Sequence, residues 1–158
     1  KFADIDPKTL NIDVESVKKL ITKKTKAIVC VHYGGLPCDM DELRNIAKKN
    51  NIILIEDAAE SLGSFIGKRH TGTFSSMATL SFNGNKLITT GGGGAILTDN
   101  KKLATRAKHL STTAKINHPW AFIHDEIGFN FRMPNLNASI GCAQIKKIDY
   151  FLKIFHMH

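Results

Sequence analysis

Polar side chains that could do chemistry follow two strand-like segments of the sequence. Glu56 and Asp57 come at the end of NIILIEDAA, and Ser81 and Lys86 come at and just beyond the end of ATLSF. In open α/β sheets, ligands bind beyond the carboxyl ends of the strands. A carboxylate at one strand end and a Ser-x-x-x-x-Lys pattern at another are groups that pyridoxal phosphate (PLP) chemistry requires.

That chemistry places a demand on each type of residue. A lysine amine must form a Schiff base with the cofactor, in surroundings that lower its pKa from about 10.4. A carboxylate must stay ionised against the pyridine nitrogen, so that the ring stays protonated and withdraws electrons. Hydroxyl and backbone N–H groups must hold the phosphate. Simpler interpretations exist, because Asp57 could cap a turn and Lys86 could lie in a surface loop, as most lysines do.

A glycine-rich segment links the lysine to the next strand. Four consecutive glycines stand at 91–94 in LSFNGNKLITTGGGGAILTDN. Glycine lets a backbone pass close to a side chain and turn back without Cβ clashes. The segment therefore predicts either a plain tight hairpin or a loop shaped around the lysine, and both interpretations can hold together.

The elements that must position these groups alternate along the chain. Asp39 is a suitable N-cap for the helix that follows it, and Leu43, Ile46 and Ala47 fit one face of that helix. The apolar run in NIILI is typical of a parallel strand buried on both faces. The segments expected are helices at 14–24, 39–50, 100–110 and 134–152 and strands at 27–33, 51–59, 78–82 and 94–98. This order predicts an α/β layered sheet that is at least partly parallel.

Composition and charge disfavour several other classes of protein. The chain has 158 residues, with 22 Lys and Arg against 14 Asp and Glu, a formal charge of +8. The basic residues come as scattered pairs typical of solvated helix faces, which favours an anionic small ligand over nucleic acid. No apolar run reaches the roughly 18 residues that a membrane span needs, and no metal-binding motif is present. Three cysteines without CxxC spacing favour a reducing cytosol, so the expected location is cytoplasmic.

Five segments follow one another in order through most of the chain: FADIDPKTLNID, VHYGGLPCDMDEL, IEDAAESLGSFIGKRHTGTFSSMATLSFNGNK, GGGGAILTDN and HDEIGFNFRMPNLNASIGCAQ. In these segments the sequence resembles the DegT/DnrJ/EryC1/StrS family of sugar aminotransferases. The resemblance implies PLP as cofactor and an aspartate-aminotransferase-like large domain (PLP fold type I) with a mixed, mostly parallel sheet. It divides the chain into an incomplete PLP-binding large domain at 1–150 and a C-terminal tail at 151–158, with the small domain missing.

The resemblance also implies a role for each matching residue. Lys86 would form the Schiff base and move the proton between substrate and cofactor, Asp57 would pair with the pyridine nitrogen, and Ser81 would bond the phosphate. Glu60 stands where the family often has glutamine, near the phenolic oxygen of the ring, and a carboxylate is electrostatically less comfortable there. Asn130 in GFNFRM would reach the phosphate of a neighbouring subunit, which implies a homodimer with shared active sites.

The expected reaction is transamination, because family members with histidine in place of the lysine act as dehydratases and Lys86 is present. The implied substrates are a nucleotide-linked 4-keto-6-deoxy sugar and an amino donor such as glutamate. The segment 111–135 looks most like the branch that acts on UDP-linked 4-keto N-acetyl sugars. One alternative is a catalytically silent domain fragment that binds PLP weakly at most. A third hypothesis is a basic DNA-binding protein, which the scattered charge disfavours.

Overall fold

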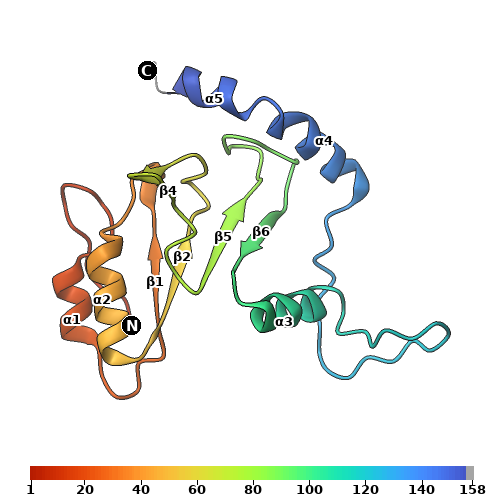
Figure 1. The fold of residues 1–158 in the computed structure, drawn as a ribbon, viewed down its shortest axis with the longest axis horizontal. Coiled ribbons are helices and arrows are strands. Elements are labelled where there is room, and N and C mark those ends of the chain that lie inside the picture. The colour runs from red at the N-terminus through yellow and green to blue at the C-terminus, as the bar shows by residue number, and fades with distance from the viewer. Residues whose placement is uncertain (156–158) are drawn as a thin grey trace.

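The computed structural model describes residues 1–155. Its centre is a four-stranded sheet in the order β1-β2-β5-β6 (Figure 1). The strands are β1 Ala27–Val31, β2 Ile53–Asp57, β5 Met77–Ser81 and β6 Gly94–Leu97. β1, β2 and β5 are parallel, and β6 runs antiparallel to β5. The expected α/β class with a mixed, mostly parallel sheet is confirmed, and the carboxyl ends of the three parallel strands meet at one edge.

Two helices cover one face of the sheet. The Asp13 carboxylate caps α1 (Val14–Leu20), and the Asp39 carboxylate caps α2 (Met40–Asn50), as the sequence predicts for Asp39. α1 ends earlier than expected, because the backbone turns to an extended conformation directly after Leu20. The apolar core lies between these helices and the sheet, and its buried members are Val17, Ile28, Cys30, Cys38, Met40, Leu43, Ile46, Ala47 and Leu54.

The opposite face of the sheet is much more exposed. Successive side chains of a strand point to opposite faces, and the outward side chains of Val29, Val31, Ile53 and Ile96 are between 43% and 57% exposed. The prediction that NIILI is buried on both faces is therefore wrong for the described residues. The reason is that α1 and α2 supply apolar cover on one side only.

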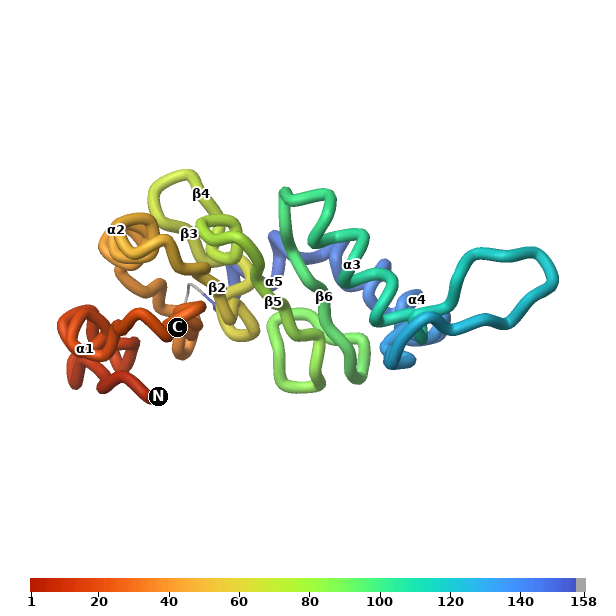
Figure 2. Tube along the Cα trace, turned by 90° about the horizontal axis from the view of Figure 1, so that it is seen from below, coloured from red at the N-terminus to blue at the C-terminus, as the bar shows by residue number. Residues whose placement is uncertain are grey.

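A long irregular segment, residues 112–134, follows α3 (Lys101–Ser111) and projects from the body of the molecule, as both views show (Figures 1 and 2). It is called the projecting segment below. Ion pairs fasten its base to this helix: Arg106 pairs with Glu126, and His109 Nε2 lies 2.7 Å from Asp125 Oδ1. His109 and the two carboxylates are close enough to share a cation. The Arg106 guanidinium already engages both oxygens of Glu126, however, so the cluster is a structural clamp.

The C-terminal part forms two helices where the sequence predicts one helix at 134–152. α4 (Asn135–Ile145) and α5 (Ile148–Phe155) are separated by a turn at two lysines. Both helices run across the edge at which the parallel strands end (Figure 1). The turn brings the Leu152 side chain of α5 against Gly63, so tertiary apolar packing overrides helical continuity here.

Short elements complete the fold. A two-stranded hairpin, β3 (Phe65–Ile66) and β4 (Arg69–His70), precedes β5, and a 3₁₀ turn (Tyr33–Gly35) follows β1. Residues 151–155 of the expected tail belong to α5, and 156–158 lie outside the described residues. In the described part of the chain, no helix has the length and apolar character that crossing a bilayer needs.

Candidate active site

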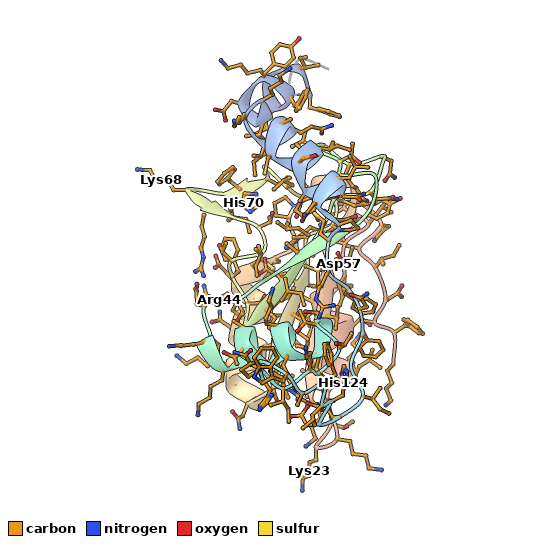
Figure 3. All side chains as sticks on the ribbon, turned by 90° about the vertical axis from the view of Figure 1, so that its right-hand side faces the viewer. Lys23, Arg44, Asp57, Lys68, His70 and His124 are labelled. Carbon is orange, nitrogen blue, oxygen red and sulfur yellow. The ribbon has the colours of Figure 1, made fainter. Side chains whose placement is uncertain are left out.

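Asp57 ends β2 at the edge where the neighbouring parallel strands also end. It pairs across the sheet with Val31 of β1 and Thr79 of β5, and Figure 3 shows it toward the end over which α4 passes. Its Oδ1 accepts hydrogen bonds from the Ala59 amide at 3.0 Å and the Thr79 hydroxyl at 3.4 Å. Among the described residues no hydrogen bond goes to Oδ2. The carboxylate therefore caps a turn, as the simpler interpretation proposed, and still has an oxygen available for a ligand.

Lys86 lies in the loop after β5, and its amine faces Glu60. Lys86 Nζ is 3.5 Å from Glu60 Oε1, and only 18% of the lysine side chain is exposed. The Gly34 amide donates to Glu60 Oε2 at 2.8 Å. The Gly34 N–H and, to a smaller extent, the Lys86 charge lower the pKa of Glu60 below its ordinary value. The lysine is thus held against a carboxylate in a mostly covered place, unlike a freely solvated surface lysine.

A cavity of about 430 Å³ opens beside these two side chains. Ser81, at the end of β5, lines it together with Lys86 and Glu60, and the Ser81 hydroxyl accepts from the Asn83 amide at 3.3 Å. The volume is in the range of small-molecule sites. Asp57 is not a lining residue, but Ala59, two positions further along the chain, is. Other lining residues include Gly34, Gly35, Ser64, Leu152 and Phe155.

The glycine-rich segment ends the loop that carries Lys86, and there its backbone comes close to the backbone of β5. Gly91 and Gly93 have positive φ angles of 77° and 105°, which glycine adopts without strain. A Cβ on Gly94 would collide with the Leu80 carbonyl oxygen across the β5–β6 ladder. α4 supports the same loop, because Gln144 Oε1 accepts a hydrogen bond from the Thr89 amide at 2.8 Å. The glycines do lead into an antiparallel strand, but residues 82–93 form the connection, so the hairpin is not the tight one that the sequence suggested. A cofactor-specific role of the glycines stays a prediction.

Asn130 lies apart from the other predicted site residues. It is exposed and lies near the C-terminal end of the projecting segment, where its backbone forms an isolated bridge with Thr112. Its Oδ1 accepts a hydrogen bond from Arg132 Nη1 at 3.2 Å. It does not line the cavity beside Lys86. In Figure 3 His124 of the same segment lies below Asp57, on the side of Lys23. A role for Asn130 in a neighbouring subunit stays a prediction.

Glu56 points to the covered face of β2, opposite to Asp57, and is fully buried. Its Oε1 accepts from the amides of Phe74 and Ser75 and from the Ser75 hydroxyl, each at 2.8 Å. Its Oε2 accepts from the Gly72 amide at 2.6 Å. The sequence groups Glu56 with Asp57 as a reactive side chain at the strand end, and the structure shows that it is instead enclosed beneath the sheet. It fastens the loop before β5 to β2.

His32 completes this enclosed cluster, and sequence reasoning missed it. The ring is fully buried just after β1, with Nε2 3.0 Å from Glu56 Oε2. The Cys38 amide donates to Nδ1 at 3.1 Å, which requires an unprotonated Nδ1. Burial lowers the pKa of His32, but Cys38 and Glu56 outweigh it and raise the pKa to about 9. The Cys38 N–H that points at Nδ1 nevertheless leaves the proton of the ring on Nε2, directed at Glu56. Burial raises the pKa of Glu56, but His32 and the other donors outweigh it and hold the pKa below its ordinary value.

The groups at the open end of the sheet fit PLP. A largely covered amine (Lys86) and a hydroxyl (Ser81) border one cavity, and a carboxylate with a free oxygen (Asp57) lies at the adjacent strand end. They are suited to serve as the nucleophile, the hydrogen-bond donor to the phosphate and the partner of the pyridine nitrogen that the cofactor needs. Together with the mostly parallel sheet, they define a PLP-binding protein of fold type I.

Comparison with known proteins gives the family. Residues 1–154 match the DegT/DnrJ/EryC1/StrS aminotransferase family, and the chain belongs to that family, which uses PLP as its cofactor. The chain is 44% identical over 151 residues to GDP-perosamine synthase of Escherichia coli O157:H7, covering 96% of this chain and 41% of that protein. GDP-perosamine synthase of Caulobacter vibrioides is 41% identical over 151 residues, covering 96% of this chain and 40% of the relative.

Solved structures support the same fold. Helicobacter pylori PseC, an aminotransferase in the biosynthesis of pseudoaminic acid, superposes with a TM-score of 0.90 at 30% identity, covering 95% of this chain and 40% of that one. An E. coli GDP-4-keto-6-deoxy-D-mannose-3-dehydratase with bound hydrated PLP gives a TM-score of 0.84 at 32% identity, covering 94% and 42%. The chain spans about two fifths of the length of the relatives it matches.

Proposed function

We propose that the protein to which this chain belongs transfers an amino group from an amino acid to a nucleotide-linked 4-keto-6-deoxy sugar in glycan biosynthesis. The observation that carries the proposal is the Lys86 amine, largely covered and bordering the cavity beside Ser81. A lysine at this place favours transamination, because it can act both as a nucleophile and as a proton carrier. The family match supports the same reaction class.

Each residue of the site has a separate task in this proposal. PLP supplies an electron sink next to the substrate carbon when it is bound. The Lys86 amine holds the cofactor and carries a proton between the substrate carbon and cofactor carbon C4′. The Asp57 Oδ2 atom, which takes no hydrogen bond among the described residues, keeps the pyridine nitrogen protonated. The Ser81 hydroxyl donates to the phosphate. Glu60 lines the same cavity beside the Lys86 amine.

The identity of the sugar carrier is the finer part of the proposal. Two of the relatives named above are GDP-perosamine synthases, and another relative is a dTDP-sugar 4-aminotransferase of Saccharopolyspora spinosa, 32% identical over 162 residues. The UDP-linked N-acetyl sugar that segment 111–135 favours stays a prediction. We further propose a cytoplasmic homodimer in which Asn130, which is exposed on the projecting segment, completes the phosphate site of the other subunit.

The test uses the full-length protein with PLP. We expect an absorption band of lysine-bound cofactor, and a shift of this band when glutamate is added. A panel of GDP-, dTDP- and UDP-linked keto sugars then identifies the aminated product. Lys86→Arg keeps the charge but should show neither the band nor turnover. A well-folded wild-type protein with PLP and a spectrum that glutamate leaves unchanged would contradict the proposal.

A second candidate concerns the chain by itself. Since it spans about two fifths of its relatives, the isolated 158-residue polypeptide would be catalytically silent and bind PLP weakly at most. The same titration on the isolated chain measures this, and PLP affinity equal to that of the full-length protein would contradict it.

A further inference from the structure

A buried polar connection runs beneath the candidate active site and joins it to the end of β1. His32 and Glu56 are both fully buried, and their side chains meet at 3.0 Å. Glu56 directly precedes Asp57 in β2, so its carboxylate lies on one face of the strand and that of Asp57 on the other. Any shift of Glu56 therefore moves the backbone that carries Asp57.

The main chain around His32 makes two further connections to the site. The His32 amide donates to the Asp57 carbonyl oxygen at 3.1 Å. Two residues later, the Gly34 amide donates to the Glu60 carboxylate at 2.8 Å, and Glu60 faces Lys86. The main chain at His32 and Gly34 therefore helps to position both carboxylate residues of the site, Asp57 and Glu60.

The orientation of the ring is fixed by the Cys38 amide. Because this N–H donates to Nδ1 at 3.1 Å, Nδ1 carries no proton in this geometry, and the proton on Nε2 bonds Glu56. Glu56 also accepts from the loop 72–75, so among the described residues the histidine adds the donor that comes from the segment directly after β1. The pair fastens the end of β1 to the end of β2 from below.

We propose that His32 is a positioning residue of the active site, which acts through Glu56 to hold Asp57 at the pyridine nitrogen of the cofactor. The inference rests on the proposed function, since it needs a cofactor whose ring Asp57 contacts. A histidine with a structural role alone would change the stability of the fold but would not change the properties of the bound cofactor at equal stability.

Two substitutions separate the two hydrogen bonds of the ring. In His32→Gln the amide nitrogen takes the place of Nε2, so the donor to Glu56 is kept and the acceptor for the Cys38 amide is lost. In His32→Asn the amide oxygen takes the place of Nδ1, so the acceptor is kept and the donor to Glu56 is lost. Both are made in the full-length protein, and PLP affinity and the pH dependence of the lysine-bound absorption band are measured.

We expect His32→Asn to weaken PLP binding about tenfold and to shift the pH midpoint of the band, while His32→Gln stays within about twofold of the wild type. Ile46→Ala, which shortens a core side chain of α2 and removes none of the hydrogen bonds of the cluster, serves as control at a matched loss of Tm. Glu56→Asp, which keeps the charge but withdraws it from His32, is expected to act like His32→Asn. It replaces that variant if His32→Asn does not fold.

The outcomes distinguish this inference from the proposed function. If the wild type shows no lysine-bound PLP, the proposed function fails and the inference with it. If the wild type binds PLP and His32→Asn or its replacement behaves like the matched Ile46→Ala control, only the positioning role is overturned. A His32→Gln protein that loses as much PLP affinity as His32→Asn would overturn it as well.

Discussion

Two neighbouring carboxylates, one on each face of β2, lie in opposite environments. Glu56 on the covered face is fully buried and accepts five hydrogen bonds, which use both of its oxygens. Asp57 on the open face is half-buried and, among residues 1–155, accepts bonds on one oxygen only. A buried carboxylate whose two oxygens both accept hydrogen bonds holds segments together, whereas a carboxylate with an oxygen that accepts none, beside a cavity, can bind a ligand. Here the alternation of side chains along the strand, more than the residue type, decides which acidic residue is structural and which is available for a ligand.

The comparison is tested most strongly by neutralising the open-face acid. Asp57→Asn keeps an oxygen for the Ala59 amide but cannot hold a proton on the pyridine nitrogen. We expect kcat to fall by on the order of a hundredfold or more, while the unfolding free energy changes by less than about 1 kcal/mol. Steady-state kinetics and urea unfolding of the full-length protein measure both. A loss of stability with kcat intact would reverse the roles assigned to the two faces.

Neutralising the covered acid should have the opposite profile. In Glu56→Gln an amide nitrogen must face backbone N–H groups or His32 Nε2, because both carboxylate oxygens accept bonds. We expect a loss of about 3 kcal/mol in the unfolding free energy, measured by urea unfolding against Asp57→Asn. Equal stability of the two variants would show that burial does not distinguish these acids.

Acid stability should report the same cluster. The pKa of Glu56 in the fold is below its ordinary value of 4.5, so the stabilisation by its ionised form is complete above about pH 4.5 and is lost as pH falls through the lower folded value. Unfolding free energies measured from about pH 6 down to about pH 3, a range that includes the ordinary pKa of 4.5, should fall in the wild type. They should fall less steeply in Glu56→Gln, and parallel slopes would contradict the assignment.

How far the sequence leads can be judged from the same residues. Lys86, Ser81 and Asp57 are found from their places after strand-like runs, because parallel strands deliver their ends to one edge. His32 gives no such signal, since a lone histidine after a strand has no partner until the sheet places it beside Glu56. The break between α4 and α5 is missed because the apolar pattern continues through it, and only the contact of Leu152 with Gly63 explains it.

The smallest effect is expected at the surface of the cavity. The Glu60 side chain is 39% exposed, and its contact with Lys86 is long at 3.5 Å. Glu60→Gln should therefore change the unfolding free energy by less than about 0.5 kcal/mol, and PLP affinity less than Asp57→Asn does. Thermal unfolding and a PLP titration measure these. A larger loss than that of Glu56→Gln would mean that the open face, and not the covered one, carries the stability.

The central claim is that the Lys86 amine bonds PLP, and borohydride reduction tests it directly. The full-length protein is incubated with PLP, reduced to make the link permanent, digested and analysed by mass spectrometry, with Lys86→Arg as control. We predict one pyridoxyl-labelled peptide, which contains Lys86 and is absent from the control. A label on another lysine, or equal labelling of wild type and control, would contradict the account.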